Sequence, residues 1–479
     1  MDCRVKPGND EERGDGSMPK RRSRLRASTP PAERKPDSAP PAPPPPAAAP
    51  VPGAASARAV ALELLGEVLE RRRALDELME SDRRFAALES RDRAFVHLMA
   101  ATVLRRLGQI DALIAHCLSR PLPEKAATAR NLLRLGIAQL LFLKLPPHAA
   151  VGETVELAER VEWGGFKGLI NAVLRRLSEE GDALIAGQDA PHLTTPDWLW
   201  RSWSAAYGEP TARAIAAACL EEPPLDLTVK GNPQGWAAEL SAEILPTGTL
   251  RRRAGGEVRS LSGYSEGGWW VQDAAAALPA RLLGEVAGKL VVDLCAAPGG
   301  KTAQLAHAGA LVTAVDRSAQ RMRRLKENLA RLRLKADTIV ADMELWRPAA
   351  PADAALLDAP CSSTGAIRRH PDIRYTKTPA DVARMAVEQD RLLSAALAMV
   401  RPGGLLVYTV CSLEPEEGPA RIAALMRSGA PCKRRPLAAS ELFGLKELID
   451  DEGALRTLPS HLAERGGLDG FYACRLERL

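Results

Sequence analysis

Two cysteines stand in closely similar sequence settings and carry the most distinctive chemistry in this chain. Cys361 follows the apolar run and acid of LLDAPCSSTG, and Cys411 ends the apolar run of LLVYTVCSLEPEE. An apolar run followed by a turn predicts the carboxyl end of a buried strand. If both strands belong to one parallel sheet, the two thiols face one pocket, where a cysteine could act as a covalent nucleophile.

Acidic residues end further apolar runs of the same region. A lone acid at a strand end is usually a turn former or a helix cap. Four of them, each after an apolar run, favour a nucleoside pocket, because carboxylates accept hydrogen bonds from hydroxyl and amino groups. They are Asp293, Asp316, Asp342 and Asp358.

The first of these runs continues into a glycine turn, DLCAAPGGKTAQL, which is typical of a nucleotide-binding start. Gly299 and Gly300 let a ligand approach backbone that a β-carbon would block. The turn is neither GxGxxG nor a P-loop, since Cys295 stands where the first P-loop glycine belongs. The spacing to Asp316 suits an acid that binds ribose hydroxyls, which disfavours a 2′-phosphate and therefore NADP. Asp342 could accept from an adenine amino group.

Residues 286 to 479 alternate apolar runs with amphipathic segments, which predicts alternating strands and helices. The runs are nearly continuous in apolar residues, as expected for a parallel sheet covered on both faces. Such a doubly wound sheet binds ligands at the carboxyl ends of its strands, where the cysteines and aspartates are expected. The predicted strands cover residues 289–294, 310–316, 337–342, 354–359 and 404–410.

Composition divides the preceding chain into three parts. Residues 1 to 56 combine the basic run PKRRSRLR with a proline- and alanine-rich stretch, which predicts a disordered tail. Residues 57 to 185 repeat apolar residues at spacings of three and four, which predicts an all-helical domain. Residues 186 to 285 mix both patterns and are expected to form a connector, in which Trp269 and Trp270 pack between domains rather than stack on a base.

Charge and cysteine usage narrow the class of protein. The net charge of +5 and pI near 8.8 are compatible with nucleic-acid binding but do not by themselves indicate it. The 8 cysteines include no CxxC pair and no zinc-like spacing with histidine, so no metal site is expected. No apolar run reaches the roughly 18 residues that span a bilayer, and the first residues lack a secretory pattern. We therefore expect a cytoplasmic protein with reduced thiols, monomeric by default.

The segments DLCAAPGGKT, VDRS, ADM, LLDAPCSSTG and YTVCSLEPEE together resemble the motifs of the RNA cytosine-5 methyltransferases, the NOL/NOP2/Sun family, in the family's order. The helical region resembles the NusB antitermination factor, an RNA-binding fold. The resemblance covers residues 57 to 479. It implies a multidomain protein, with an all-α NusB-like N-terminal domain and an α/β Rossmann-like methyltransferase domain that depends on S-adenosylmethionine.

The resemblance also assigns residues to the cofactor. Asp316 would bind the ribose and Asp342 would lie near the adenine, while Asp358 sits closer to the reacting centre. Carboxylates at the sheet edge favour the cationic sulfonium of this cofactor. Lys301 either supports the site or simply begins the following helix. The loop assigned to the cofactor consists of Cys295, Ala296, Ala297, Pro298, Gly299, Gly300 and Lys301.

The implied reaction gives the two thiols different roles. Carbon 5 of cytosine is a poor nucleophile, and a thiolate that adds to carbon 6 activates it. By resemblance Cys411 is this thiolate, Cys361 assists product release, and Asp358 holds the cytosine at its N3 edge. A thiol must have its pKa lowered from about 8.5 to react readily near neutrality, and a helix predicted just after Cys411 could lower it through its dipole.

The expected partner is 16S rRNA with an unpaired target cytosine, because base chemistry requires a target outside the base stack. Arg368, Arg369 and Arg374 follow the Asp358 turn and are expected to contact the target strand. The same chemistry on tRNA or DNA is the nearest alternative, and a DNA enzyme would attack with Cys361. An alternative from another class is a non-catalytic RNA-binding ribosome assembly factor, which the intact motifs disfavour.

Overall fold

The computed structural model describes residues 56–161, 164–253 and 256–479. The predicted tail lies outside these residues except for Ser56, whose hydroxyl accepts a hydrogen bond from the backbone N–H of Ala59 at 3.2 Å. A serine in this position satisfies one of the free N–H groups at a helix start. Helix α1 (Ala57–Arg71) therefore begins directly after it.

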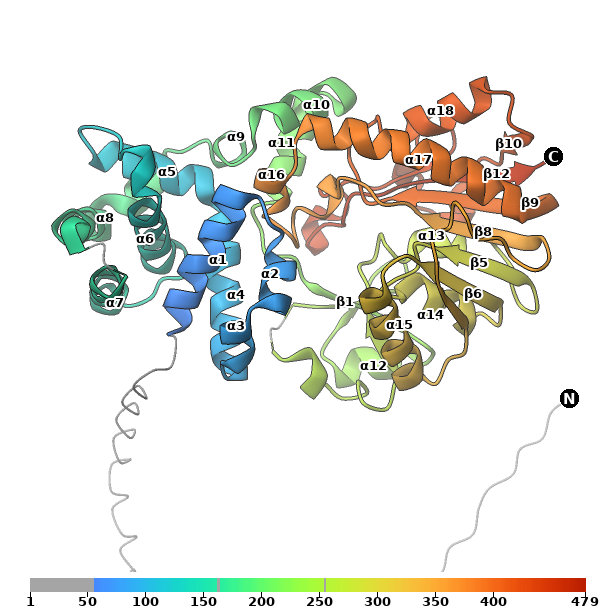
Figure 1. Ribbon diagram of the computed structural model, residues 1–479, viewed down its shortest axis with the longest axis horizontal. Coiled ribbons are helices and arrows are strands. Elements are labelled where there is room, and N and C mark those ends of the chain that lie inside the picture. Colours follow the sequence, from blue (N-terminus) through green and yellow to red (C-terminus); the bar gives the residue numbers. More distant parts are fainter. Residues whose placement is uncertain (1–55, 162–163, 254–255) are drawn as a thin grey trace, which may run out of the picture. The chain divides into compact units, whose positions relative to one another are not determined.

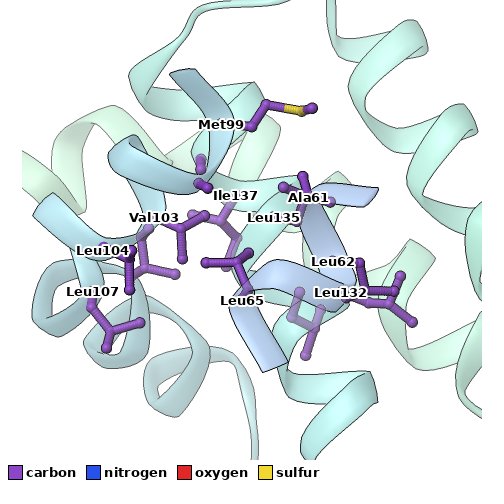
Figure 2. Close-up of a cluster of buried hydrophobic side chains, with 14 of the residues drawn as sticks. Ala61, Leu62, Leu65, Met99, Val103, Leu104, Leu107, Leu132, Leu135 and Ile137 are labelled. Carbon is purple, nitrogen blue, oxygen red and sulfur yellow. The ribbon is translucent and has the colours of Figure 1, made fainter. Parts of the chain in front are cut away.

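The N-terminal part is an all-helical bundle, blue to teal in Figure 1. Apolar residues at spacings of three and four turn one face of each helix towards a shared core. Leu62 and Leu65 of α1 lie in one buried cluster with Val103 and Leu135 (Figure 2). None of the described helices is long and apolar enough to cross a membrane. After α1 come α2 (Leu75–Ser81), α3 (Arg83–Ala87), α4 (Ser90–Arg105), α5 (Leu107–Cys117), α6 (Ala127–Ile137) with its π-helical continuation η2 (Ala138–Phe142), α7 (Pro147–Arg160) and α8 (Lys167–Ala186).

The middle part combines short helices with a small antiparallel sheet of strand order β2-β3-β1-β4. Trp269 is fully buried against this sheet, and Trp270 is 4% exposed and packs on Ala296 and Leu325 of the following α/β part. Both tryptophans are therefore packing residues. Trp270 packs between two parts of the chain as predicted, whereas Trp269 packs within the connector. The elements are α9 (Ala190–Leu193), α10 (Asp197–Tyr207), α11 (Glu209–Ala218), β1 (Leu225–Val229), α12 (Pro233–Glu239), β2 (Glu243–Ile244), β3 (Leu250–Arg252) and β4 (Trp269–Val271).

The C-terminal part is built on a large sheet of order β10-β12-β9-β8-β5-β6-β7. The five central strands run parallel, so their carboxyl ends meet at one edge. All five were predicted from the apolar runs. They are β5 (Leu290–Leu294), β6 (Leu311–Asp316), β7 (Asp337–Val340), β8 (Ala352–Asp358) and β9 (Val400–Val410).

Both faces of this sheet are covered, as the continuous apolar runs require. Leu357 and Tyr408 pack with Leu393 on one face, whereas Leu356 and Val407 pack with Leu305 on the other. Alternate residues of a strand thus serve opposite layers. The helices are α13 (Leu278–Arg281), α14 (Gly300–His307), α15 (Ala319–Leu332), α16 (Ile373–Thr376), α17 (Pro379–Met399) and α18 (Pro419–Arg427).

A purely parallel sheet was an incomplete prediction. The chain returns at its end as β12 (Tyr472–Arg478), which pairs antiparallel with β9, and β10 (Cys432–Arg434) and β11 (Leu455–Arg456) pair antiparallel with β12. β12 carries charged residues between its apolar ones, so its run was not as continuous as those of the central strands. It covers the side of β9, the strand that ends at Cys411.

The helical bundle contacts the segment between β8 and α17. The Tyr375 hydroxyl donates to the Leu104 carbonyl at 3.0 Å, and Arg374 donates to the Arg105 carbonyl at 3.1 Å. Asp372 accepts from the backbone N–H of Leu75 at 3.2 Å. The turn that follows Asp358 is thus held from the N-terminal part of the chain.

Candidate active site

The two singled-out cysteines lie together. The Sγ atoms of Cys361 and Cys411 are 3.5 Å apart, and the Ser363 hydroxyl lies 3.5 Å from the Cys411 sulfur. Parallel pairing of β8 with β9 sets Asp358 opposite Thr409, so the segments that follow both strands start side by side. The sequence prediction of one pocket with two thiols is consistent with this geometry.

A buried carboxylate ties the two cysteine segments together. Glu417 accepts from the backbone N–H of Ser362 at 2.8 Å and from the hydroxyl of Ser412 at 2.5 Å. Gln389 of α17 adds a bond from its amide to the carbonyl of Pro360 at 2.8 Å. The residues beside each cysteine are thereby fixed, which keeps the sulfurs in place. This role of Glu417 was not predicted, although Glu417 belongs to the EPEE run that follows Cys411.

The two thiols differ in acidity. The hydrogen bond from Cys361 lowers the pKa of the Cys411 thiol below its ordinary value, and the Lys301 ammonium adds to this effect. The same hydrogen bond, together with burial, raises the pKa of Cys361. The predicted contribution of a helix directly after Cys411 is wrong, because α18 begins only at Pro419. Cys411 is therefore the better thiolate of the pair, for a different reason than predicted.

Lys301 and Asp358 form an ion pair beside the thiols. The Lys301 Nζ lies 2.7 Å from Asp358 Oδ2 and 5.2 Å from the centre of the Phe471 ring. Burial disfavours the ammonium, but the Asp358 carboxylate outweighs it, and the pKa of Lys301 is raised. Lys301 therefore supports the site in addition to standing in the first turn of α14.

Three of the predicted aspartates line one cavity with both cysteines. Its volume is about 300 Å³, and it includes Asp316, Asp342 and Asp358. Asp316 is buried and accepts from the backbone N–H groups of Ala297 and Ser318 at 3.1 and 2.8 Å. Asp342 is exposed at the rim. Asp293 differs, because it is fully buried, accepts from the Thr302 hydroxyl at 2.5 Å and does not line this cavity. Burial raises the pKa of Asp293 to about 7.

The backbone of the glycine turn adopts a left-handed conformation at Gly299, which requires glycine. Gly299 has φ 102°, and a β-carbon there would lie 2.7 Å from the Leu325 side chain. Cys295 lines the cavity of the two thiols, and burial raises its pKa to about 12, so it is not a nucleophile. The remaining loop residues line a second cavity of about 460 Å³ on another side of the loop: Ala296, Ala297, Pro298, Gly299, Gly300 and Lys301.

The chain is similar to known proteins over most of its length. The family 16S rRNA methyltransferase RsmB/F matches residues 280–477, and the NusB family matches residues 55–179. Ribosomal RNA small subunit methyltransferase B of Cronobacter sakazakii is 38% identical over 411 residues, which cover 82% of this chain and 94% of that protein. The protein of the same name from Pseudomonas putida is 37% identical over 450 residues, covering 89% and 98%. The chain belongs to the RsmB/F family.

Solved structures agree with this family in fold. The crystal structure of PH0851 has a TM-score of 0.65 at 22% identity, covering 88% of this chain and 99% of that one. NSun6 from Pyrococcus horikoshii with SFG has a TM-score of 0.52 at 18% identity, covering 59% and 98%. The predicted fold class, a NusB-like helical domain followed by a Rossmann-like methyltransferase domain, is confirmed. As a member of the RsmB/F family, the chain is an rRNA methyltransferase that uses S-adenosylmethionine.

The site of this RsmB/F protein offers what such a cofactor requires. Val315, Met343 and Leu392 give the 300 Å³ cavity apolar walls, and its carboxylates face the same space. Hydroxyl and amino groups of a nucleoside are donors that carboxylate oxygens accept, and a sulfonium cation is favoured beside them. The residues present therefore fit the cofactor.

The three arginines predicted to contact the target strand have other partners. Arg368 and Arg374 are each 1% exposed, and Arg368 donates to the Gly466 carbonyl at 2.7 Å. Arg369 forms ion pairs with Asp273 and Asp469 at 2.7 and 3.0 Å. The prediction was wrong because an arginine-rich loop was read as a surface, whereas these guanidinium groups satisfy carbonyls and acids inside the protein.

Proposed function

We propose that this protein methylates carbon 5 of a cytosine in 16S rRNA through a covalent bond between Cys411 and the base. The observation that supports this most is the pair of sulfurs 3.5 Å apart whose acidities are shifted in opposite directions. One thiol is suited to attack and the other to hold a proton. Homologues named rRNA small subunit methyltransferase B support the choice of RNA.

In this proposal the Cys411 thiolate adds to carbon 6 of the ring, and the electron pair of the 5,6 double bond moves towards carbon 5. The Asp358 carboxylate holds the N3 edge of the base by accepting from the 4-amino group, and the adjacent Lys301 ammonium stabilises negative charge that develops on the base. S-adenosylmethionine supplies the methyl group when bound, held by Asp316 at the ribose, Asp342 near the adenine and the loop from Cys295. Loss of the carbon 5 proton to water, assisted by Cys361, then restores the 5,6 double bond and expels the Cys411 thiolate.

The proposed division of labour follows the predicted boundaries. Residues 57–185 and the connector 186–285 bind RNA around an unpaired target cytosine, and residues 286–479 perform the chemistry. A monomer is sufficient, since the described residues of one chain supply all the side chains used.

The test uses Cys361→Ala and Cys411→Ala, each incubated with small-subunit rRNA and labelled cofactor and then run on a denaturing gel. We expect Cys361→Ala to trap a protein–RNA adduct, because attack proceeds while release fails, and Cys411→Ala to give neither adduct nor product. Cys117→Ala is the matched control, since Cys117 lies in the helical part at comparable partial burial and should methylate normally.

The opposite pattern, with an adduct trapped by Cys411→Ala, makes Cys361 the attacking thiol. Methylation by the wild type with no adduct in any variant excludes the covalent mechanism. If the wild type methylates tRNA in preference to rRNA, the reaction is as proposed but tRNA is its substrate. If the wild-type protein binds the cofactor but leaves the RNA unmethylated, the non-catalytic assembly-factor alternative is favoured.

A further inference from the structure

The second cavity, of about 460 Å³, has the cofactor loop as one wall, but its remaining walls have no role in the function described above. It meets the catalytic cavity at Asp358, which lines both, and Lys301 also lines it. Its other walls come from the connector and from α15, including Arg259, Tyr264 and Arg331. A volume of this size is typical of ligand pockets. A ligand in it would lie directly beside the reacting centre.

One wall is an arginine stacked on a tyrosine. The guanidinium carbon of Arg331 lies 4.1 Å from the centre of the Tyr264 ring, and Nη1 donates to the carbonyls of Tyr264 and Trp269 at 2.8 and 3.1 Å. These bonds fix the guanidinium plane. A fixed guanidinium or aromatic plane is a surface on which a nucleobase stacks. Val271 adds an apolar side chain that is 47% exposed.

The charges of this cavity favour an anionic ligand. Three acids line it. Asp273 and Asp358 are each paired with a cation at 2.7 Å, and Asp293 is fully buried and accepts from the Thr302 hydroxyl at 2.5 Å. Arg331 bonds only carbonyls, and Arg259 is exposed, and within the described residues neither of these two cations has an acid partner at ion-pair distance. Unpaired arginines next to a stacking surface match the phosphate and the base of a nucleotide.

We propose that this cavity holds the RNA nucleotide adjacent to the target cytosine, with its base against the Arg331–Tyr264 stack and Val271 and its phosphate at Arg259. The proposal rests on the proposed function, because a nucleotide reaches this place as the neighbour of a base bound at Asp358 and Lys301. In this proposal the connector contacts the base next to the target cytosine, in addition to joining the helical part to the methyltransferase part.

The test compares Val271→Glu and Arg259→Ala with controls of the same chemistry elsewhere. Leu311→Glu changes a 59% exposed apolar residue at the amino end of β6, on the edge of the sheet opposite the site. Arg427→Ala removes an exposed arginine in the last turn of α18. Both targets and both controls have exposed side chains, so all four variants should fold, which thermal melts monitored by circular dichroism check.

Steady-state methylation of a 16S rRNA transcript and filter binding of the same transcript are measured for each variant. We expect KM and Kd for the RNA to rise about tenfold in Val271→Glu and Arg259→Ala, since the first change disturbs the stacking of one base and the second removes one phosphate contact. Arg259→Ala should also reduce the salt dependence of RNA binding by about one phosphate contact. KM for S-adenosylmethionine and the adduct-trapping pattern should stay unchanged, and Leu311→Glu and Arg427→Ala should resemble the wild type.

RNA affinity equal to that of the controls overturns this inference, as does a rise in KM for the cofactor in place of the RNA. Failure of the proposed function looks different, because it shows as wild-type protein that forms no adduct or does not methylate rRNA. Filter binding still tests the cavity in that case, since it requires no turnover.

Discussion

At the scale of single residues, the thiols of Cys361 and Cys411 differ in acidity because different side chains surround them. Cys361 and Cys411 were predicted together because their flanking sequences look alike, and parallel strands bring like ends to like positions. What makes one of them the stronger acid could not be predicted, because it depends on Lys301, Ser363 and a hydrogen bond between the sulfurs. Pairs of groups pushed apart in pKa are a recurring feature of catalytic sites.

Lys301→Met tests this account. Its ammonium lowers the pKa of Cys411, so its removal should move the alkaline rise of kcat to higher pH, since more hydroxide is needed to form the thiolate. We also expect kcat to fall about a hundredfold, as on removal of one charge-stabilising donor. The pH profile of kcat with saturating RNA measures both effects. Lys289→Met, an exposed lysine at the amino end of β5, is the control and should leave the profile in place. An unshifted profile in Lys301→Met removes Lys301 from the activation of the thiol.

At the scale of elements, one buried arginine joins two strands of the connector and also fastens the connector to the C-terminal segment. Arg251 of β3 pairs with Asp226 of β1 at 2.6 Å, both side chains being fully buried, and Arg251 also donates to the Gly467 carbonyl at 2.7 Å. Arg251→Met leaves the Asp226 charge buried without this partner, which should lower the free energy of unfolding by about 3–5 kcal/mol. Urea denaturation measures the loss. The double change Asp226→Asn with Arg251→Met should recover part of it, whereas no loss in the single variant shows that Asp226 is neutral or solvated.

The elements also show where sequence patterns stop being informative. The five central strands were predictable, because a strand buried on both faces must be continuously apolar. β12 was not, since its alternating charges mark it only as half-buried, and its partner β9 lies about sixty residues earlier in the chain. The buried arginines Arg368 and Arg374 were mistaken for a surface loop for a related reason. Carbonyls that satisfy them come from segments distant in sequence, such as Arg105 and Gly466.

At the scale of the whole molecule, the helical part does more in this arrangement than offer a separate RNA surface. Arg105 donates to the Arg368 carbonyl at 3.1 Å, and Arg374 donates back to the Arg105 carbonyl. Arg368 and Arg374 both lie in the segment that starts at the Asp358 turn and ends at α17. A base bound at Asp358 and an RNA bound to the helical part are therefore linked through the same short stretch of chain.

Arg374→Met tests that link. Arg374 also donates to the Cys219 carbonyl at 3.2 Å, so its loss leaves two buried carbonyls without a donor, which should cost about 2–4 kcal/mol of unfolding free energy. Because α16 follows the Asp358 turn, we expect kcat to fall as well. KM for S-adenosylmethionine should stay near the wild-type value, because the proposed cofactor residues Asp316 and Asp342 lie at the ends of β6 and β7. Thermal unfolding should separate into two transitions, because the helical part is then bound less tightly to the methyltransferase part.

Tyr375→Phe is the control. It loses a single 3.0 Å bond to the Leu104 carbonyl, so it should cost only about 1 kcal/mol and keep one transition. If Arg374→Met unfolds in one transition with unchanged kcat, the helical part acts on the reaction through RNA alone.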